Sequence, residues 1–180
     1  YWFQPDFDMH DLGTAHEKIT EHIVKFNTEV EELCSGLTDT LVIVTADHGL
    51  VDTDWRYIPD YPELAACLER VPSIESRAMT FFIKAGMHAK FEEEFAKHFG
   101  GCYLLFTKEQ VLSQKLFGCG EPHPRALGFV GDYLAVATGG VSIEGAPSLS
   151  HPTFKAAHAG LTPAETNIPF IAVEAVKKPC

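Results

Sequence analysis

The chain has 180 residues, enough for one ordinary domain with an attached lobe and for a sizeable hydrophobic core. Hydrophobic residues make up 46% of the sequence and charged residues 22%, which excludes an intrinsically disordered chain. The formal net charge of −11 argues against nucleic acid and anionic membranes as partners, because both require clustered Lys and Arg. No apolar run approaches the ~20 residues of a membrane span. An acidic protein still binds a phosphate ester where metal ions supply local positive charge.

Cysteine usage bears on the cellular compartment. The cysteines are scattered, odd in number and without a CxxC pair: Cys34, Cys67, Cys102, Cys119 and Cys180. This pattern favours reduced, structural thiols in a cytoplasmic compartment over a disulfide scaffold or a zinc–thiolate site. Residue 1 is Tyr, and no signal-peptide pattern opens the sequence. We therefore expect the natural N-terminus, with any signal peptide, to lie upstream.

The first 45 residues alternate a predicted strand, helix and strand. Residues 1–4 form an aromatic run that Pro5 halts, which predicts the end of a buried strand, and residues 6–13 are polar and turn-like. Residues 14–34 carry apolar side chains at helical spacing, at Ile19, Ile23, Phe26, Val30 and Leu33. Residues 41–44 predict a fully buried strand. A strand–helix–strand unit favours a parallel sheet.

In the middle of the chain, the predicted helices and strands alternate. Short helices are predicted at 62–71, 89–99 and 108–112, and strands at 79–83, 103–106 and 133–138. We expect an α+β lobe inserted at residues 55–148, with a core of Phe81, Phe82, Phe91, Phe95 and Phe99. Residues 148–160 are loop-like, and 168–173 predict a last buried strand. The predicted fold is α/β, with residues 1–54 and 149–180 forming the core of a mostly parallel sheet flanked by helices.

Residues of metal-ligand type occur in three places. Asp6 and His10 are four residues apart, a spacing at which both side chains can lie on one side of a helical turn. Asp47 and His48 follow the most hydrophobic predicted strand, and His158 lies in the loop before Gly160. Each feature alone is compatible with a structural or solvated role. Carboxylates combined with neutral imidazoles are the ligand set that suits zinc.

Other polar residues leave two interpretations open. His123 and Arg125 lie in a loop between prolines, either as a substrate contact from the inserted lobe or as a rigid surface turn. Asp8 is expected to be a solvated loop carboxylate, with metal ligation as the alternative. Asp52 is a candidate for orienting a ligand from outside the first coordination sphere. His22 is expected on the exposed face of the predicted helix.

Three segments together resemble the nucleotide pyrophosphatase and type I phosphodiesterase branch of the alkaline phosphatase superfamily. Residues 5–13 are similar to the PDxxGHxxG element of that family, except that Met9 replaces the glycine before the His. Residues 45–49 read TADHG, and residues 158–165 read HAGLTPAE and lead into IPFI at 168–171, similar to elements of the same family. The resemblance covers both ends of the chain and is loose in the intervening lobe.

The resemblance implies a ligand set for two divalent ions, with zinc favoured and Mn or Mg as alternatives. Asp6, His10 and His158 would hold one ion. Asp47 and His48 would hold the second, together with an earlier Asp and a nucleophilic Thr or Ser that lie upstream in such proteins. The expected function is therefore the C-terminal portion of a two-metal phosphoester hydrolase that acts on a small phosphate ester, nucleotides included.

Alternative functions remain open at this stage. The chain alone is expected to be inactive, so one alternative is a metal-binding fragment without catalysis. A phosphomutase or sulfatase of the same superfamily would share the metal-binding elements. A sheet that lacks its N-terminal neighbours would expose its edges, which makes a homo-oligomer an expected partner arrangement.

Overall fold

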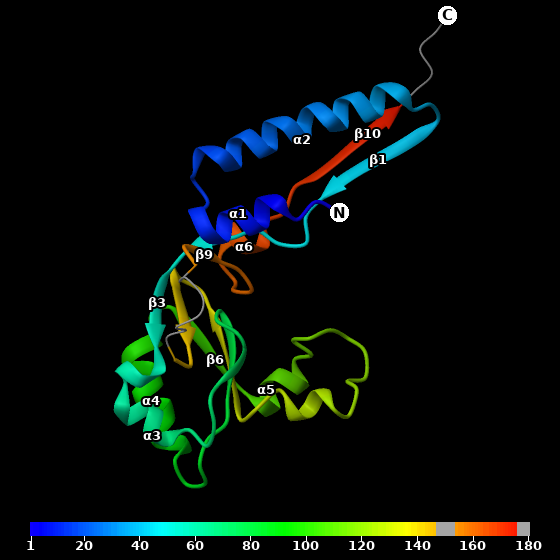
Figure 1. Ribbon diagram of the computed structural model, residues 1–180. Coiled ribbons are helices and arrows are strands. Elements are labelled where there is room, and N and C mark those ends of the chain that lie inside the picture. The colour runs from blue at the N-terminus through cyan, green and yellow to red at the C-terminus, as the bar shows by residue number, and fades with distance from the viewer. Residues whose placement is uncertain (147–153, 176–180) are drawn as a thin grey trace, which may run out of the picture. The chain divides into compact units, whose positions relative to one another are not determined.

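The computed structural model describes residues 1–146 and 154–175 (Figure 1). The chain divides into two compact units. Unit 1 comprises Tyr1–Asp52, Phe154–His158 and Pro163–Cys180, and unit 2 comprises Thr53–Thr153 and Ala159–Thr162. Within the described part of the chain, no helix is both long and apolar enough to cross a membrane.

Among its described residues, unit 1 combines three helices with two small antiparallel sheets. Its elements are α1 (Gln4–Leu12), α2 (Glu17–Gly36), β1 (Thr40–Thr45), β2 (Val51–Asp52), β9 (Ala156–Ala157), α6 (Pro163–Thr166) and β10 (Phe170–Ala175). β1 pairs with β10 in register Thr40↔Ala175 to Thr45↔Phe170, and β2 pairs with β9. Figure 1 shows α2 extending alongside the β1–β10 ribbon. Both sheets are two-stranded, so the described residues add no further strand to either one.

Unit 2 is built around a four-stranded antiparallel sheet of order β4-β5-β7-β6. The elements of this unit are β3 (Asp54–Tyr57), η1 (Ile58–Asp60), α3 (Pro62–Cys67), β4 (Ser73–Glu75), β5 (Ala78–Phe81), α4 (His88–Phe99), β6 (Tyr103–Thr107), α5 (Lys108–Ser113), η2 (Ala126–Gly128), β7 (Tyr133–Ala137) and β8 (Val141–Glu144). β3 and β8 form a parallel pair. The capping box of Thr107 and Gln110 defines the start of α5, because each side chain bonds the other residue's backbone N–H.

The hydrophobic core lies in unit 2. Phe91, Phe95 and Phe99 recur every four residues on α4 and are almost completely buried against Phe81 and its neighbours. In unit 1 the buried apolar side chains among the described residues are few: Ile19, Leu50, Ala156, Ala157 and Ala175. The fully buried apolar core of unit 1 is therefore small.

The N-terminal segment differs from the sequence-based prediction. Residues 1–4 were expected to form a strand and residues 6–13 a turn, but α1 begins at Gln4 and ends at Leu12. The physical reason is Pro5, which occupies the first turn of the helix, where its missing N–H costs nothing and its fixed φ suits the helix. Gly13 ends the helix with a φ of +90°, a conformation that favours glycine.

The expected mostly parallel sheet is only partly present. A mixed α/β fold is observed, but β3–β8 is the single parallel pair among the described residues, and β1 pairs antiparallel with β10. The strands at 41–44 and 168–173, which were expected to be fully buried, are instead partly exposed to solvent. Leu41 and Ile43 of β1 are 61% and 52% exposed, and Phe170 of β10 is 72% exposed. In unit 1, α2 lies along one face of the β1–β10 ribbon. Among the described residues, no second layer covers the opposite face of the ribbon.

Candidate metal centre

Asp6 lies in the first turn of α1, where the partial positive charge of the helix N-terminus favours a carboxylate. Its side chain is about one third exposed, but its Oδ1 atom is buried and has no hydrogen-bond partner among the described residues. The side chain of His10, one turn later, places Nε2 3.7 Å from this oxygen. A buried carboxylate oxygen without a partner carries a desolvation cost, which a bound cation would offset.

His10 is held by contacts with the backbone of β9 and of the residue just before it. Its Nδ1 atom lies 2.7 Å from the carbonyl oxygen of Ala156, and its own carbonyl accepts the N–H of Lys155 at 2.7 Å. A carbonyl oxygen only accepts, so Nδ1 carries the ring proton and donates it. The lone pair is therefore on Nε2, the atom that faces Asp6. This bond fixes the ring in the tautomer that can bind a cation.

His48 follows β1, and Gly49 places it close to the α6 segment. The N–H of Gly49 donates to the carbonyl of Glu165 at 2.8 Å, and a Cβ at position 49 would lie 2.0 Å from the carbonyl oxygen of Ala164. Only glycine permits this approach. His48 Nδ1 lies 3.1 Å from the Gly49 carbonyl oxygen, which again leaves Nε2 as the nitrogen with a lone pair.

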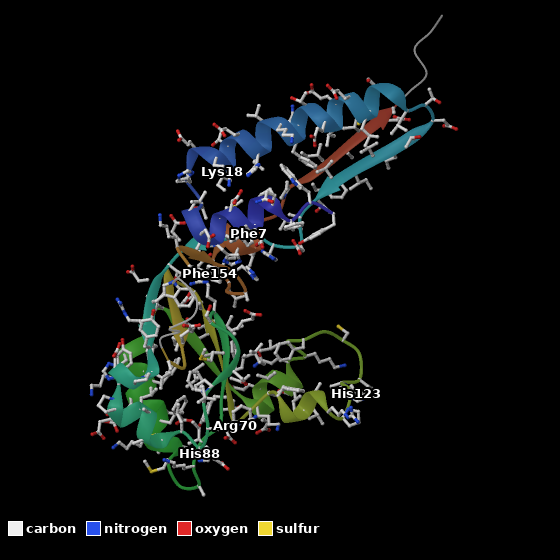
Figure 2. All side chains as sticks on the ribbon, in the orientation of Figure 1. Phe7, Lys18, Arg70, His88, His123 and Phe154 are labelled. Carbon is white, nitrogen blue, oxygen red and sulfur yellow. The ribbon has the colours of Figure 1, made fainter. Side chains whose placement is uncertain are left out.

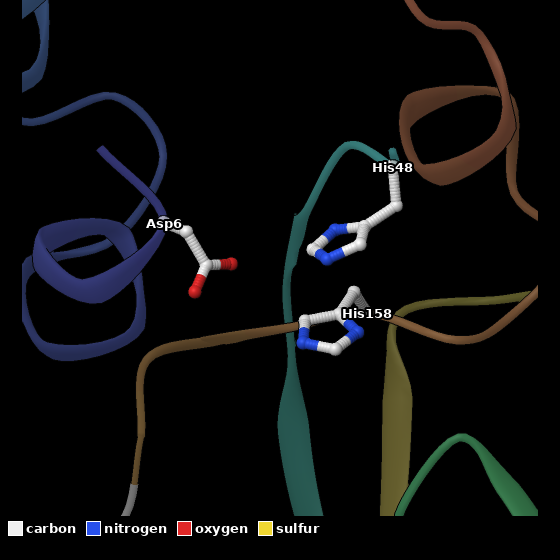
Figure 3. A group of neighbouring side chains, drawn as sticks. All are labelled: Asp6, His48 and His158. Carbon is white, nitrogen blue, oxygen red and sulfur yellow. The ribbon is translucent and has the colours of Figure 1, made fainter. Parts of the chain in front are cut away.

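His158 directly follows β9 and completes the cluster. Its ring is stacked on His48, with centroids 3.9 Å apart and planes at 22°, and it lies 5.2 Å from the ring of His10. One ligand atom from each of Asp6, His48 and His158 lies within 4.8 Å of the others. In Figure 3 the carboxylate of Asp6 points from α1 toward the two imidazole rings. These three residues come from segments that are distant in the sequence.

Asp47 is at the edge of this cluster. It is 62% exposed, and its Oδ1 atom is 3.9 Å from His48 Nε2. Its Oδ2 atom accepts a long hydrogen bond of 3.5 Å from the phenol of Tyr1. The negative charge of Asp47 raises the pKa of the Tyr1 phenol, with a smaller contribution from Asp6. The carboxylates of Asp47 and Asp6 therefore both act electrostatically on the Tyr1 phenol.

The donor set fits a divalent cation of the zinc type. It combines carboxylate oxygens with imidazole nitrogens, and hydrogen bonds fix the tautomers of His10 and His48. It also includes one buried oxygen without a hydrogen-bond partner among the described residues. The grouping differs in one respect from the expected ligand sets. Asp6 and His158, assigned to one ion, lie closest to His48, assigned to the other. His10 lies within reach of Asp6 but outside this closest group.

His123 and Arg125 belong to unit 2 and are exposed. His123, labelled in Figure 2, lies in the loop between α5 and η2. Its Nδ1 atom accepts the backbone N–H of Arg125 at 3.2 Å, a local turn contact. A role for either residue in substrate contact stays a prediction.

Asp8 is not the solvated loop carboxylate that was expected. Its side chain is only 6% exposed, and it accepts hydrogen bonds from Lys18 and His22 of α2. His22 accordingly lies against α1, and only 19% of its side chain is exposed. Asp52 accepts the N–H of Thr14 at 2.7 Å and so secures the chain just after α1. No local pattern in the sequence indicates the Asp8 contacts, which connect residues 10 and 14 positions apart.

The sequence profile of one family matches this chain over residues 1–99, and its description is "Type I phosphodiesterase / nucleotide pyrophosphatase". The match covers more than half of the 180 residues. The chain therefore belongs to the type I phosphodiesterase/nucleotide pyrophosphatase family. No curated protein matches the chain.

Solved structures share the fold at low sequence identity. Murine ectonucleotide pyrophosphatase/phosphodiesterase 5, an inactive variant in complex with AMP, is 19% identical with a TM-score of 0.63, over 97% of this chain and 46% of that one. The human enzyme of the same name is 19% identical with a TM-score of 0.65, over 96% and 45%. Phosphonoacetate hydrolase from Sinorhizobium meliloti 1021, in complex with phosphonoformate, is 17% identical with a TM-score of 0.65, over 93% and 43%. The chain thus spans less than half the length of these proteins.

Proposed function

We propose that this chain supplies the metal-binding part of a two-metal phosphoester hydrolase. The observation that carries the proposal is the convergence of Asp6, His48 and His158 within 4.8 Å, with a buried Asp6 oxygen that has no other partner in the described chain. Membership of the family points in the same direction. Residues 1–54 and 149–180 would form the metal-binding core, and residues 55–148 the inserted lobe.

Five residues would hold two divalent ions, with zinc preferred for this mixture of imidazole and carboxylate donors. Asp6, His10 and His158 are assigned to one ion, and Asp47 and His48 to the other. Bound divalent ions polarise a phosphoryl oxygen and lower the pKa of a bound water to roughly 7. The backbone carbonyls that accept from the His10 and His48 Nδ1 atoms hold both rings in the tautomer that binds a cation.

The proposed substrate is a small phosphate ester, with nucleotides and phosphodiesters as the leading class. Among the related structures, the murine enzyme was solved with AMP and the phosphonoacetate hydrolase with phosphonoformate and phosphonoacetate. A chain with a net charge of −11 requires cations to attract such an anion. His123 and Arg125 are proposed as substrate contacts from the lobe.

None of the five proposed ligands is a hydroxyl nucleophile. We assign the nucleophilic Thr or Ser, and the further Asp ligand of the second ion, to sequence outside these 180 residues. The chain alone would then bind metal without turnover. The cytoplasmic assignment remains a prediction that rests on the cysteine pattern.

The test combines zinc binding with an activity assay. Chelator competition should show zinc bound by the wild-type chain and an at least ~100-fold weaker affinity in Asp6→Ala, because a first-sphere ligand is lost. Asp11→Ala is the matched control, since Asp11 is an exposed carboxylate on the same helix. A wild-type chain that binds no zinc would overturn the proposed function. Hydrolysis of bis(p-nitrophenyl) phosphate by the wild-type chain alone would overturn the assignment of the nucleophile to another segment.

A further inference from the structure

A buried carboxylate connects the two helices of unit 1. Asp8 lies on α1 between Asp6 and His10, and only 6% of its side chain is exposed. Lys18 Nζ donates to Asp8 Oδ1 at 3.0 Å, and His22 Nε2 lies 2.6 Å from Asp8 Oδ2. A carboxylate only accepts, so His22 donates from Nε2. Both carboxylate oxygens of Asp8 are therefore engaged by donors from α2.

The contacts from α2 form one continuous stripe. Lys18, His22 and Phe26 are spaced four residues apart, so their side chains line one face of the helix. The first two bind Asp8. Trp2 packs edge-on against His22, with centroids 5.7 Å apart, and stacks on Phe26 at 4.9 Å. This stripe thus holds the chain at two points on either side of Asp6.

Because of the position of Asp8 on α1, these contacts determine the direction in which the opposite face of α1 points. Side chains four residues apart, such as Asp6 and His10, share a helix face. A residue two positions away is rotated by about 200° and lies on the opposite face. Because the bonds to Asp8 fix one face of α1 against α2, they also fix the direction in which the other face points. That other face carries Asp6 and His10.

We propose that Asp8 is a positioning residue that acts through His22 and Lys18 to set the rotation of α1, and so aims Asp6 and His10 at the metal centre. This inference rests on the proposed function, because it assumes that Asp6 and His10 bind metal. Asp8 itself is occupied by hydrogen-bond donors on both oxygens and does not enter the ligand set.

The experiment measures zinc affinity by chelator competition and the absorption spectrum of the Co²⁺-substituted chain. Asp8→Ala should weaken zinc binding about 10- to 100-fold, the range typical of residues that orient metal ligands, and should alter the Co²⁺ spectrum. Asp8→Asn keeps the shape and an acceptor for Lys18, so its loss should be smaller. In an Asp8→Ala background, His22→Ala should weaken zinc binding much less than it does in the wild type, because the His22–Asp8 bond is already absent and only the contact with Trp2 remains to be lost.

Two controls separate positioning from stability. Ile19→Ala removes a buried side chain from the same helix but neither donor to Asp8, so it should lower the unfolding temperature and leave zinc affinity and the Co²⁺ spectrum unchanged. Glu29→Ala removes the exposed Lys25–Glu29 ion pair of α2 and should change neither quantity. A loss of affinity in Ile19→Ala equal to that in Asp8→Ala would contradict the inference.

The remaining outcomes are also decisive. A folded Asp8→Ala chain with wild-type zinc affinity and an unchanged Co²⁺ spectrum would overturn the positioning role. If Asp8→Ala does not fold, Asp8→Asn and His22→Gln take its place, and unchanged affinity in both would overturn it equally. A wild-type chain that binds no zinc overturns the proposed function instead, so the two failures are distinguishable.

Discussion

The imidazole rings of His48 and His158 are stacked, with centroids 3.9 Å apart and planes at 22°, although the two residues are 110 positions apart in the chain. The stack brings the segment that follows β1 and the residue that follows β9 to the same place, opposite the carboxylate of Asp6. The cluster therefore depends on contacts between three separate segments of unit 1.

Loss of one ring from this stack should mainly weaken the affinity for zinc. We expect His158→Ala to weaken zinc affinity at least ~100-fold, because a first-sphere donor and the ring that orients His48 are lost together. Chelator competition measures the affinity, and circular dichroism checks that the fold is retained. His123→Ala removes an exposed histidine of unit 2 and should bind zinc as the wild type does. Equal affinity in both variants would exclude His158 from the site.

The stability of unit 1 should depend on pH through Asp8. Hydrogen bonds, first from His22 and then from Lys18, lower the pKa of Asp8 from an ordinary value of 3.8 to about 2. Because the pKa is lower in the folded chain, this carboxylate contributes its full stabilisation above pH 3.8 and loses it as the pH falls toward 2.

Urea unfolding of the wild type and of Asp8→Asn, with EDTA present, tests this linkage. The difference in the free energy of unfolding between the two chains should be largest above about pH 5 and should shrink as the pH falls toward about 2. A difference that stays constant over this range would show that Asp8 is not stabilised in its ionised form.

Because Gly49 approaches α6 closely, we expect any residue larger than glycine at position 49 to be destabilising. In Gly49→Ala the new Cβ would lie 2.0 Å from the Ala164 carbonyl oxygen, so the two backbone segments must separate. We expect a loss of about 1–3 kcal/mol in the free energy of unfolding from this overpacking, together with weaker zinc binding through His48. Gly36→Ala is the control, because a Cβ there meets nothing within 4 Å. Equal stability of both variants would contradict the prediction.

Arg77 should be a major determinant of the stability of unit 2. Its guanidinium is completely buried and donates to the carbonyl oxygens of Gly139 and Val141 at 2.8 and 2.9 Å. Arg77→Met removes the buried charged donor from both carbonyls, although the Tyr103 hydroxyl still donates to that of Val141, and the loss should cost about 3 kcal/mol in thermal or urea unfolding. Arg56→Met, at an exposed position, should cost much less. Similar losses in both variants would argue against this role of Arg77.

The sequence was most informative where apolar spacing is regular. The helix predicted at 89–99 corresponds to α4, and the strands predicted at 103–106 and 133–138 correspond to β6 and β7. Four of the five phenylalanines expected in the lobe core are buried. Phe82 is the exception, and its ring lies under the guanidinium of Arg70, 3.4 Å from the ring centroid. Periodicity succeeds here because one face of each element is buried locally.

Sequence patterns did not predict how the strands pair. The short strands β2, β3, β4, β8 and β9 were missed, because two to four residues carry too little periodicity to register. The antiparallel pairing of β1 with β10 joins residues more than 120 positions apart, and alternation within a strand says nothing about its partner. The segment 148–153 of the predicted loop lies outside the described residues.

The metal centre could be anticipated as a set of residues but not as an arrangement. Motifs indicated Asp6, His10, Asp47, His48 and His158, since ligand-type residues recur in each matching segment. The stacking of His48 on His158, and the closest grouping of these two with Asp6, depend on tertiary contacts that no local spacing encodes. Their assignment as metal ligands remains a prediction until zinc binding is measured.

The exposed β1–β10 ribbon limits the chain concentration at which these measurements can be made. β1 reads TLVIVT, without the charge, proline or bulge that proteins commonly place on an open strand to discourage self-association. Leu41 and Ile43 present its apolar face to water. Raising the chain concentration should therefore favour aggregation through this strand, and Ile43→Lys should raise the concentration at which the chain stays dispersed without changing a proposed ligand.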